Sequence, residues 1–252
     1  MTTRWQEIAD TLRDRIESGE YPPGSKIPAI PELMDDFGVA RDTVRDAVHR
    51  LANEGLVTPL RGVGTVVRDT TPVHLGYTST APARTWDVQT GEQKTSDKII
   101  EASWETADED ILARLKLPKG SQVVHRVRHM HRGKQIAQVV DQWIPDHVAS
   151  AIANATGDDL ADVDHEQSTD LYSQMAAAGH PPAWDEETIR SRMPLPDEVT
   201  VLELPVGVPV QITYRVTSND KHEPLETATF VAASDRMSQT FTVPLHYGEG
   251  TR

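Results

Sequence analysis

The chain of 252 residues contains no cysteine, so it has neither disulfide bonds nor thiolate metal sites. It also lacks any run of about twenty apolar residues, the length that a membrane-spanning helix requires. The N-terminal stretch MTTRWQEIADTL is without the continuous apolar core of a secretory signal peptide. These absences predict a cytoplasmic protein that makes no membrane contact.

Positive charge is scarce overall, because the formal net charge is −14. Residues 1–70 hold nine Lys and Arg against twelve Asp and Glu, so most of the acidity lies in the remainder of the chain. Strong acidity argues against sequence-independent binding of nucleic acid, which needs broad neutralisation of phosphates. Residues 41–68 nevertheless contain more arginines than acidic residues: Arg41, Arg45, Arg50, Arg61 and Arg68. This local excess is compatible with a small module that docks on an acidic partner.

Apolar periodicity and breaker residues predict three short helices in the first seventy residues. The first helix repeats apolar residues at helical spacing from Trp5 to Ile16, after a possible capping box of Thr3 and Gln6. The second, PELMDDF, begins at Pro31 and stops at Gly38. The third is VARDTVRDAVHRL at residues 39–51. The run LVTPLRGVGTVV follows as two β-rich stretches around a glycine turn, which predicts a hairpin.

Helix, helix-turn-helix and hairpin in this order are typical of a winged helix-turn-helix domain. In the third helix, Val44, Val48 and Leu51 share one face and must point to the core. Arg41 and Arg45 then lie on the outer side, near the start of the helix. That part of a recognition helix meets base edges in the major groove of DNA.

The rest of the chain contains an internal repeat. LKLPKGSQVVHRVR (115–128) resembles LELPVGVPVQITYR (202–215), and each copy follows a short acidic segment and leads into β-rich sequence. LYSQMAAAG between the copies is expected to be helical. We therefore predict an α+β domain with an antiparallel sheet at residues 96–252, joined to residues 1–70 by a linker at residues 71–95.

Two resemblances to known families rest on these motifs. The segment GSKIPAIPELMDDFGVARDTVRDAVHRLANEGLVTPLRGVGTVV is similar to the DNA-binding domain of GntR-type bacterial transcription regulators. The second domain, with its two Leu-x-Leu-Pro-x-Gly units, Leu171-Tyr172 and Pro224-Leu225-Glu226, resembles the UTRA effector domain of the HutC subfamily. That resemblance implies a fold similar to chorismate lyase for the C-terminal domain.

The first resemblance implies DNA contacts by the third helix and by the hairpin, which is the wing. The residues concerned are Arg41, Thr43, Arg45, Arg61, Gly62, Gly64 and Thr65. Arginine can bind guanine in bidentate fashion, and glycine allows close approach of the backbone. The chain departs from the family at Ala29, Ile30 and Pro31, where Ser-Glu-Arg is usual, and at Ala40, where a serine N-cap is usual.

The second resemblance implies an effector site lined by Arg126 and Arg128 on one strand, with Glu226 opposite and with Tyr172 and Asp170 beside them. Two converging arginines suggest an anionic effector. Asp170 stands where binders of phosphorylated sugars tend to have serine, and a carboxylate disfavours a doubly charged phosphate, so the effector class stays open. His125, His129 and His131 have no suitably spaced partner, and neither a metal nor a cofactor is predicted.

Together these features predict a ligand-responsive repressor that binds a pseudo-palindromic operator on double-stranded DNA as a homodimer. A small-molecule effector would reorient the paired domains and release the DNA. Two alternatives remain open from the residues: an enzyme using the chorismate-lyase-like domain, and a winged-helix module that binds protein. The enzyme is disfavoured because no nucleophile-base motif and no phosphate-cradling loop is present.

Overall fold

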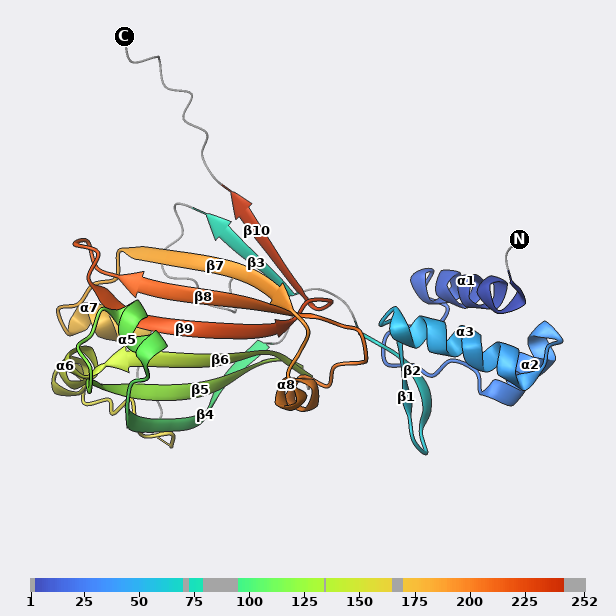
Figure 1. Cartoon of the computed structure of the whole chain (residues 1–252), viewed down its shortest axis with the longest axis horizontal. Helices are drawn as coiled ribbons and strands as arrows, with labels where there is room; N and C mark the ends of the chain where they lie inside the picture. Colours follow the sequence, from blue (N-terminus) through green and yellow to red (C-terminus); the bar gives the residue numbers. More distant parts are fainter. Residues whose placement is uncertain (1–2, 70–72, 79–94, 134, 165–169, 243–252) are drawn as a thin grey trace, which may run out of the picture. The chain divides into compact units, whose positions relative to one another are not determined.

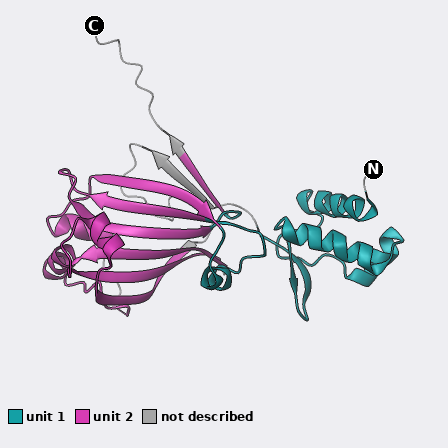
Figure 2. Cartoon of the chain, in the orientation of Figure 1, with its two compact units in different colours: residues 1–72, 193–210, 233–236 teal, residues 73–192, 211–232, 237–252 magenta. Residues whose placement is uncertain are grey.

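The computed structural model describes residues 3–69, 73–78, 95–133, 135–164 and 170–242 (Figure 1). The chain divides into two compact units (Figure 2). The first comprises residues 1–72, 193–210 and 233–236, and the second comprises residues 73–192, 211–232 and 237–252.

The first unit begins with the predicted three helices and hairpin. Its elements are α1 (Arg4–Glu17), α2 (Ile30–Phe37), α3 (Arg41–Asn53), β1 (Val57–Leu60) and β2 (Gly64–Val67). Gln6 accepts a 2.7 Å hydrogen bond from the backbone N–H of Thr3, which is one of the two bonds of the predicted capping box. Gly38 adopts the left-handed conformation that ends α2. The expected winged helix-turn-helix fold is confirmed.

Apolar side chains from all three helices and from β1 and β2 form one buried core. Leu12, Leu33, Val44 and Leu51 are completely buried in it. Because Val44 and Leu51 lie on the inner face of α3, the opposite face of this helix is held toward solvent. Burial of such side chains contributes about 1.5–3 kcal/mol each relative to exposure, which fixes the orientation of the helix.

Two later segments complete the first unit, and Arg68 joins one of them to the helices. Its guanidinium donates a 3.0 Å hydrogen bond to the carbonyl oxygen of Gly55, directly after α3, and also binds the carboxylate of Asp235. Gly55 has a φ of 76°, and an added Cβ would lie 3.2 Å from the Arg68 guanidinium and 3.4 Å from Val208. Glycine is therefore required both by the backbone conformation and by the packing.

The second unit is built on a six-stranded sheet in the order β4-β5-β6-β9-β8-β7 (Figure 1). The strands are β4 (Thr95–Thr106), β5 (Gln122–Arg132), β6 (Gln135–Pro145), β7 (Trp184–Arg192), β8 (Val210–Ser218) and β9 (Pro224–Ala233). The helices are α5 (Glu109–Leu115), α6 (Asp146–Thr156) and α7 (Leu171–Ala177), with α8 (Pro196–Val201) belonging to the first unit. Ile144 and Leu225 of the sheet pack against Ile152 of α6 and Met175 of α7, in agreement with the predicted α+β class.

The two copies of the internal repeat form the same kind of turn. In each copy a short helix ends at a residue with positive φ, Lys116 (54°) after α5 and Glu203 (49°) after α8. Gly120 and Gly207 then adopt φ values of 87° and 89° before strands β5 and β8 begin. The shared Leu-x-Leu-Pro-x-Gly pattern thus forms the same turn before the first strand of two hairpins, β5–β6 and β8–β9.

Of the predicted linker at residues 71–95, residues 73–78 form strand β3 (Val73–Thr78), which pairs in parallel with β10 (Met237–Thr242). Residues 71–72 and 79–94 lie outside the described residues, and residue 95 begins β4.

Candidate functional site

The outer face of α3 presents the two arginines that the sequence singled out. Arg41 and Arg45 are exposed, whereas Val44 between them is completely buried. Neither arginine makes a hydrogen bond or an ion pair within the part of the chain that the structure describes. Arg50, at the other end of the helix, differs because its Nε lies 2.5 Å from Glu54 Oε1. The start of α3 therefore presents two guanidinium groups that can bind a ligand.

The wing is the turn between β1 and β2. The N–H of Val63 donates a 3.1 Å hydrogen bond to the carbonyl oxygen of Leu60. Gly62 and Gly64 have φ values of 77° and 117°, a conformation in which a side chain would be strained. Arg61 and both glycines are exposed, and Thr65 is half-buried at the base of the turn. The predicted wing thus exposes the guanidinium group of Arg61 and the backbone of Gly62 and Gly64.

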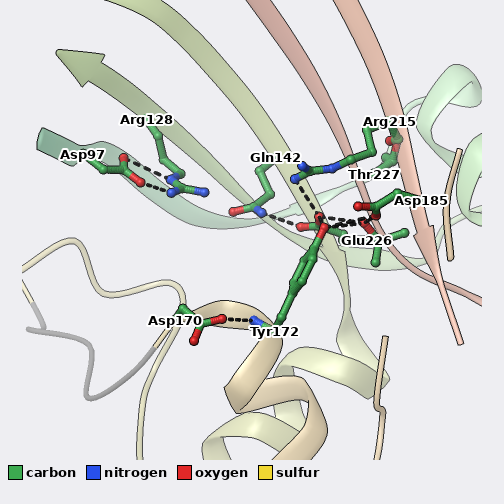
Figure 3. A network of polar contacts seen from close by, with 10 residues as sticks. Asp97, Arg128, Gln142, Asp170, Tyr172, Asp185, Arg215, Glu226 and Thr227 are labelled. Atoms are coloured by element: carbon green, nitrogen blue, oxygen red, sulfur yellow. Dashed lines mark hydrogen bonds and ion pairs between the residues drawn. The ribbon is translucent and has the colours of Figure 1, made fainter. Parts of the chain in front are cut away.

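A polar network inside the second unit centres on Glu226 of β9, which is completely buried (Figure 3). One carboxylate oxygen, Oε1, accepts hydrogen bonds from Thr217 (3.0 Å), Arg215 (3.0 Å) and Tyr172 (3.3 Å). The other oxygen accepts a hydrogen bond from Gln142 Nε2. Strands β6, β8 and β9 and helix α7 therefore meet at one carboxylate.

Tyr172 connects this carboxylate to β7. Its hydroxyl lies 2.8 Å from Thr217 Oγ1 and 3.2 Å from Asp185 Oδ1, and Thr217 Oγ1 lies 2.7 Å from the same oxygen of Asp185. Burial raises the pKa of Tyr172, with the nearby carboxylates adding to the shift and the charge of Arg215 opposing it. The phenol consequently stays protonated and acts as a hydrogen-bond donor.

Arg126 and Arg128 lie on β5, two residues apart and so on one face of the sheet. Arg126 is only 2% exposed, and this burial lowers its pKa to about 10, although the charge of Glu226 opposes the shift. Arg128 forms an ion pair with Asp97 of β4 through Nε and Nη2 (Figure 3). Burial lowers the pKa of Arg128 as well, again against the charge of Glu226. Their guanidinium groups suit a compact anion.

The structure brings together Tyr172 and Glu226 directly and places the predicted Arg126 and Arg128 on the same sheet. Asp170 has a different local role, since its side chain caps α7 by accepting from the N–H groups of Tyr172 (3.1 Å) and Ser173 (3.2 Å).

Sequence reasoning missed five members of the network: Asp97, Gln142, Asp185, Arg215 and Thr217. Arg215 had a signal, because it ends the second repeat copy at the position that Arg128 holds in the first. The other four belong to no sequence motif. They reach the network only because the order of strands in the sheet brings their segments together.

Three histidines lie on β5, and the sequence predicted that they hold no metal ion. His125 lies 3.0 Å from Asp141 Oδ1, and its ring stacks on Trp143 with the ring centroids 4.9 Å apart. The hydrogen bond to Asp141 raises the pKa of His125 above 6.5 despite partial burial. Within the described ranges no group of three or more potential ligands is arranged to hold a metal ion.

Comparison with known proteins connects both sites to families. Residues 4–67 match the family described as bacterial regulatory proteins of the gntR family, and residues 91–238 match the UTRA domain. An uncharacterised HTH-type transcriptional regulator of Streptomyces coelicolor, SCO4628, is 28% identical, covering 96% of this chain and 93% of the relative. The mannosyl-D-glycerate transport/metabolism system repressor MngR of Escherichia coli is 26% identical over 56% of this chain and 58% of its own.

Solved structures show the same fold. The crystal structure of PhnF from Mycobacterium smegmatis has a TM-score of 0.57 and 22% sequence identity, covering 96% of this chain and 99% of that one. No helix in the described ranges is long and apolar enough to cross a membrane.

Proposed function

Because the chain belongs to the GntR family of bacterial transcription regulators and carries a UTRA effector domain, we propose that it is a repressor released from DNA by a small anionic effector. In this proposal residues 1–70 bind DNA, residues 96–252 bind the effector and form a homodimer, and the protein works in the cytoplasm. The relatives are transcription regulators, and the chain is a regulator rather than an enzyme.

The observation that supports DNA reading most strongly is the pair of exposed, unpaired arginines above the buried face of α3. In this proposal Arg41 and Arg45 would bind guanine edges, where each bidentate contact would contribute roughly 1–3 kcal/mol of discrimination. Thr43 would bind a phosphate, and the wing from Arg61 to Thr65 would lie against the backbone or the minor groove. Two copies would read two half-sites of a pseudo-palindrome about one helical turn apart.

The effector site is proposed to take a single anionic group at Arg126 and Arg128. Asp97 already balances Arg128, and Glu226 balances Arg215, so a doubly charged phosphate would add excess negative charge. A carboxylate would compete with Asp97 for Arg128 and would add only half the negative charge of such a phosphate. The hydroxyl of Tyr172 would bind a polar group at the other end of the effector.

Repression and release follow from linkage. An effector that binds the DNA-free arrangement of the dimer more tightly than the DNA-bound one shifts the population toward the free form, and one that binds both equally has no effect. The relative MngR is named as a repressor, which supports this direction of control.

Selection of bound fragments from genomic DNA by the full-length protein tests the DNA-binding half of this proposal. Wild-type protein is expected to enrich a pseudo-palindromic sequence, and Arg45→Ala is expected to lose that enrichment. Arg50→Ala is the matched control, since Arg50 lies on the same helix but is ion-paired with Glu54. Failure of the wild type to enrich any sequence would contradict the proposal.

The effector half is tested on the enriched fragment with a panel of carboxylates and phosphate esters as probes. At least one monoanion is expected to release the DNA from wild-type protein, and Arg126→Met is expected to abolish that release. Release by a probe that acts equally on Arg126→Met would contradict the assigned anion site.

A further inference from the structure

Strand β7 is an edge of the six-stranded sheet, and its charged side chains are of both signs. Among the described strands it pairs only with β8, and it stands last in the sheet order. Free edges template pairing with other chains unless charged side chains (lysine above all), proline or a bulge block them. At the opposite edge β4 carries Lys98 and a bulge between Ile99 and Glu101. The sequence WDEETIRSR of β7 contains no lysine, proline or glycine.

The exposed side chains of β7 differ in their contacts, since the ring of Trp184 stacks on His222 whereas two charged side chains further along the strand make no contact of this kind. Along the strand only Glu187 and Arg192 are partly buried. Trp184 is 56% exposed and Ile189 is 37% exposed. Glu186 and Arg190 form no hydrogen bond or ion pair within the described residues. The middle of β7 therefore carries one acidic and one basic side chain that the described residues do not engage.

The hydrogen-bonding pattern shows which residues face the free edge. The N–H of Ala183 donates to the carbonyl oxygen of Ser218, so the start of β7 meets the end of β8 and the two strands are antiparallel. Backbone groups of alternate residues point to alternate sides of a strand. Glu186, Thr188 and Arg190, which share the opposite parity from Ala183, therefore direct their N–H and C=O groups outward.

Charge along β7 is complementary to itself when the strand is reversed. Its first half is acidic, with Asp185, Glu186 and Glu187, and its second half is basic, with Arg190 and Arg192. An antiparallel pair of identical strands related by a two-fold axis at Thr188 places Glu186 opposite Arg190 in both directions. Opposite charges directly across such a pair are stabilising, and like charges are destabilising.

We propose that β7 pairs antiparallel with β7 of a second copy of this chain, about a two-fold axis at Thr188, and joins the two sheets into one. This interface specifies the homodimer of the proposed function and rests on it. The same strand carries Asp185 in the network of Tyr172 and Thr217 on its other face. An effector that contacts this network would therefore act on the same strand that joins the two copies.

Charge exchange in the full-length chain tests the pairing, with the dimer Kd measured by sedimentation equilibrium. Glu186→Arg and Arg190→Glu each turn two attractive pairs into two repulsive ones, so each is expected to weaken the dimer on the order of 10- to 100-fold. An equimolar mixture of the two variants restores opposite charges at both positions and is expected to form a heterodimer. The double variant is expected to dimerise like the wild type and controls for folding.

A cysteine placed on the axis gives a second readout, because the natural chain has no cysteine. Directly opposed residues of an antiparallel pair have Cα atoms about 4.5–5.5 Å apart, within the range that a disulfide spans. Thr188→Cys is expected to cross-link upon mild oxidation, and Ser103→Cys on the exposed β4 edge is expected to remain monomeric on a reducing-agent-free gel. Cross-linking at both positions, or at neither, would overturn the interface.

The outcomes separate this interface from the proposed function on which it rests. A wild-type dimer whose Kd is unchanged by both single substitutions overturns pairing through β7 but leaves the homodimer intact. A wild-type chain that sediments as a monomer at micromolar concentration overturns the homodimer and the interface together.

Discussion

Substitution of Glu226 by glutamine should destabilise the second unit strongly, because this carboxylate is completely buried and accepts hydrogen bonds from four side chains. Glutamine keeps the shape but removes the charge that balances Arg215, whose side chain is only 15% exposed. Removing one partner of a buried ion pair typically costs about 3–5 kcal/mol. Since Arg215 keeps some solvent and Asp185 still attracts it, we expect the lower end, about 3 kcal/mol.

Urea unfolding followed by tryptophan fluorescence measures this loss. With a slope of roughly 2 kcal/mol per molar urea, the transition of Glu226→Gln should move about 1.5 M lower than that of the wild type. Glu101→Gln is the control, because Glu101 is exposed and makes no hydrogen bond or ion pair in the described part of the chain. The control should stay within about 0.5 kcal/mol. A shift for Glu226→Gln no larger than that of the control would refute the assigned role of the network.

Three further outcomes follow from local contacts. Ala40 has the dihedral angles of an N-cap but no acceptor, so Ala40→Ser should stabilise the protein by about 1 kcal/mol in thermal unfolding, and no gain would contradict the cap geometry. Arg68 is buried against Asp235, and Arg68→Ala should cost about 3 kcal/mol in urea unfolding, whereas a loss below about 1 kcal/mol would show that the contact is dispensable. The hydrogen bond to Asp141 raises the pKa of His125, so its stabilisation is complete below pH 6.5 and is lost as pH rises through the raised value. The stability difference between wild type and His125→Gln should therefore shrink with rising pH, and a constant difference would exclude this linkage.

The three helices and the hairpin of the first unit were predictable in detail because their signals are local, whereas residues 193–210 and 233–236 were expected in the second domain. Caps, glycine stops and the three-to-four-residue spacing of apolar residues lie within single helices, and they located α1, α2 and α3 to within a few residues. The outward direction of Arg41 and Arg45 then followed from the buried positions of Val44 and Leu51.

The second unit was predictable in class and in its repeat, but the composition of its polar network was not. Glu226 and Tyr172 were expected from the family resemblance, whereas Gln142 and Asp185 join them through strand pairing between distant segments. No pattern within a single strand reveals which strand will lie beside it.

The most direct test of DNA reading by α3 is a fluorescence anisotropy titration of the full-length protein on its selected operator and on a scrambled duplex at one salt concentration. Loss of a bidentate arginine contact corresponds to about 1–3 kcal/mol, so Arg45→Ala should bind the operator roughly 5- to 150-fold more weakly and change little on the scrambled duplex. Equal affinity of wild-type protein for both duplexes, or unchanged operator binding by Arg45→Ala, would contradict the assignment of α3 as the recognition helix.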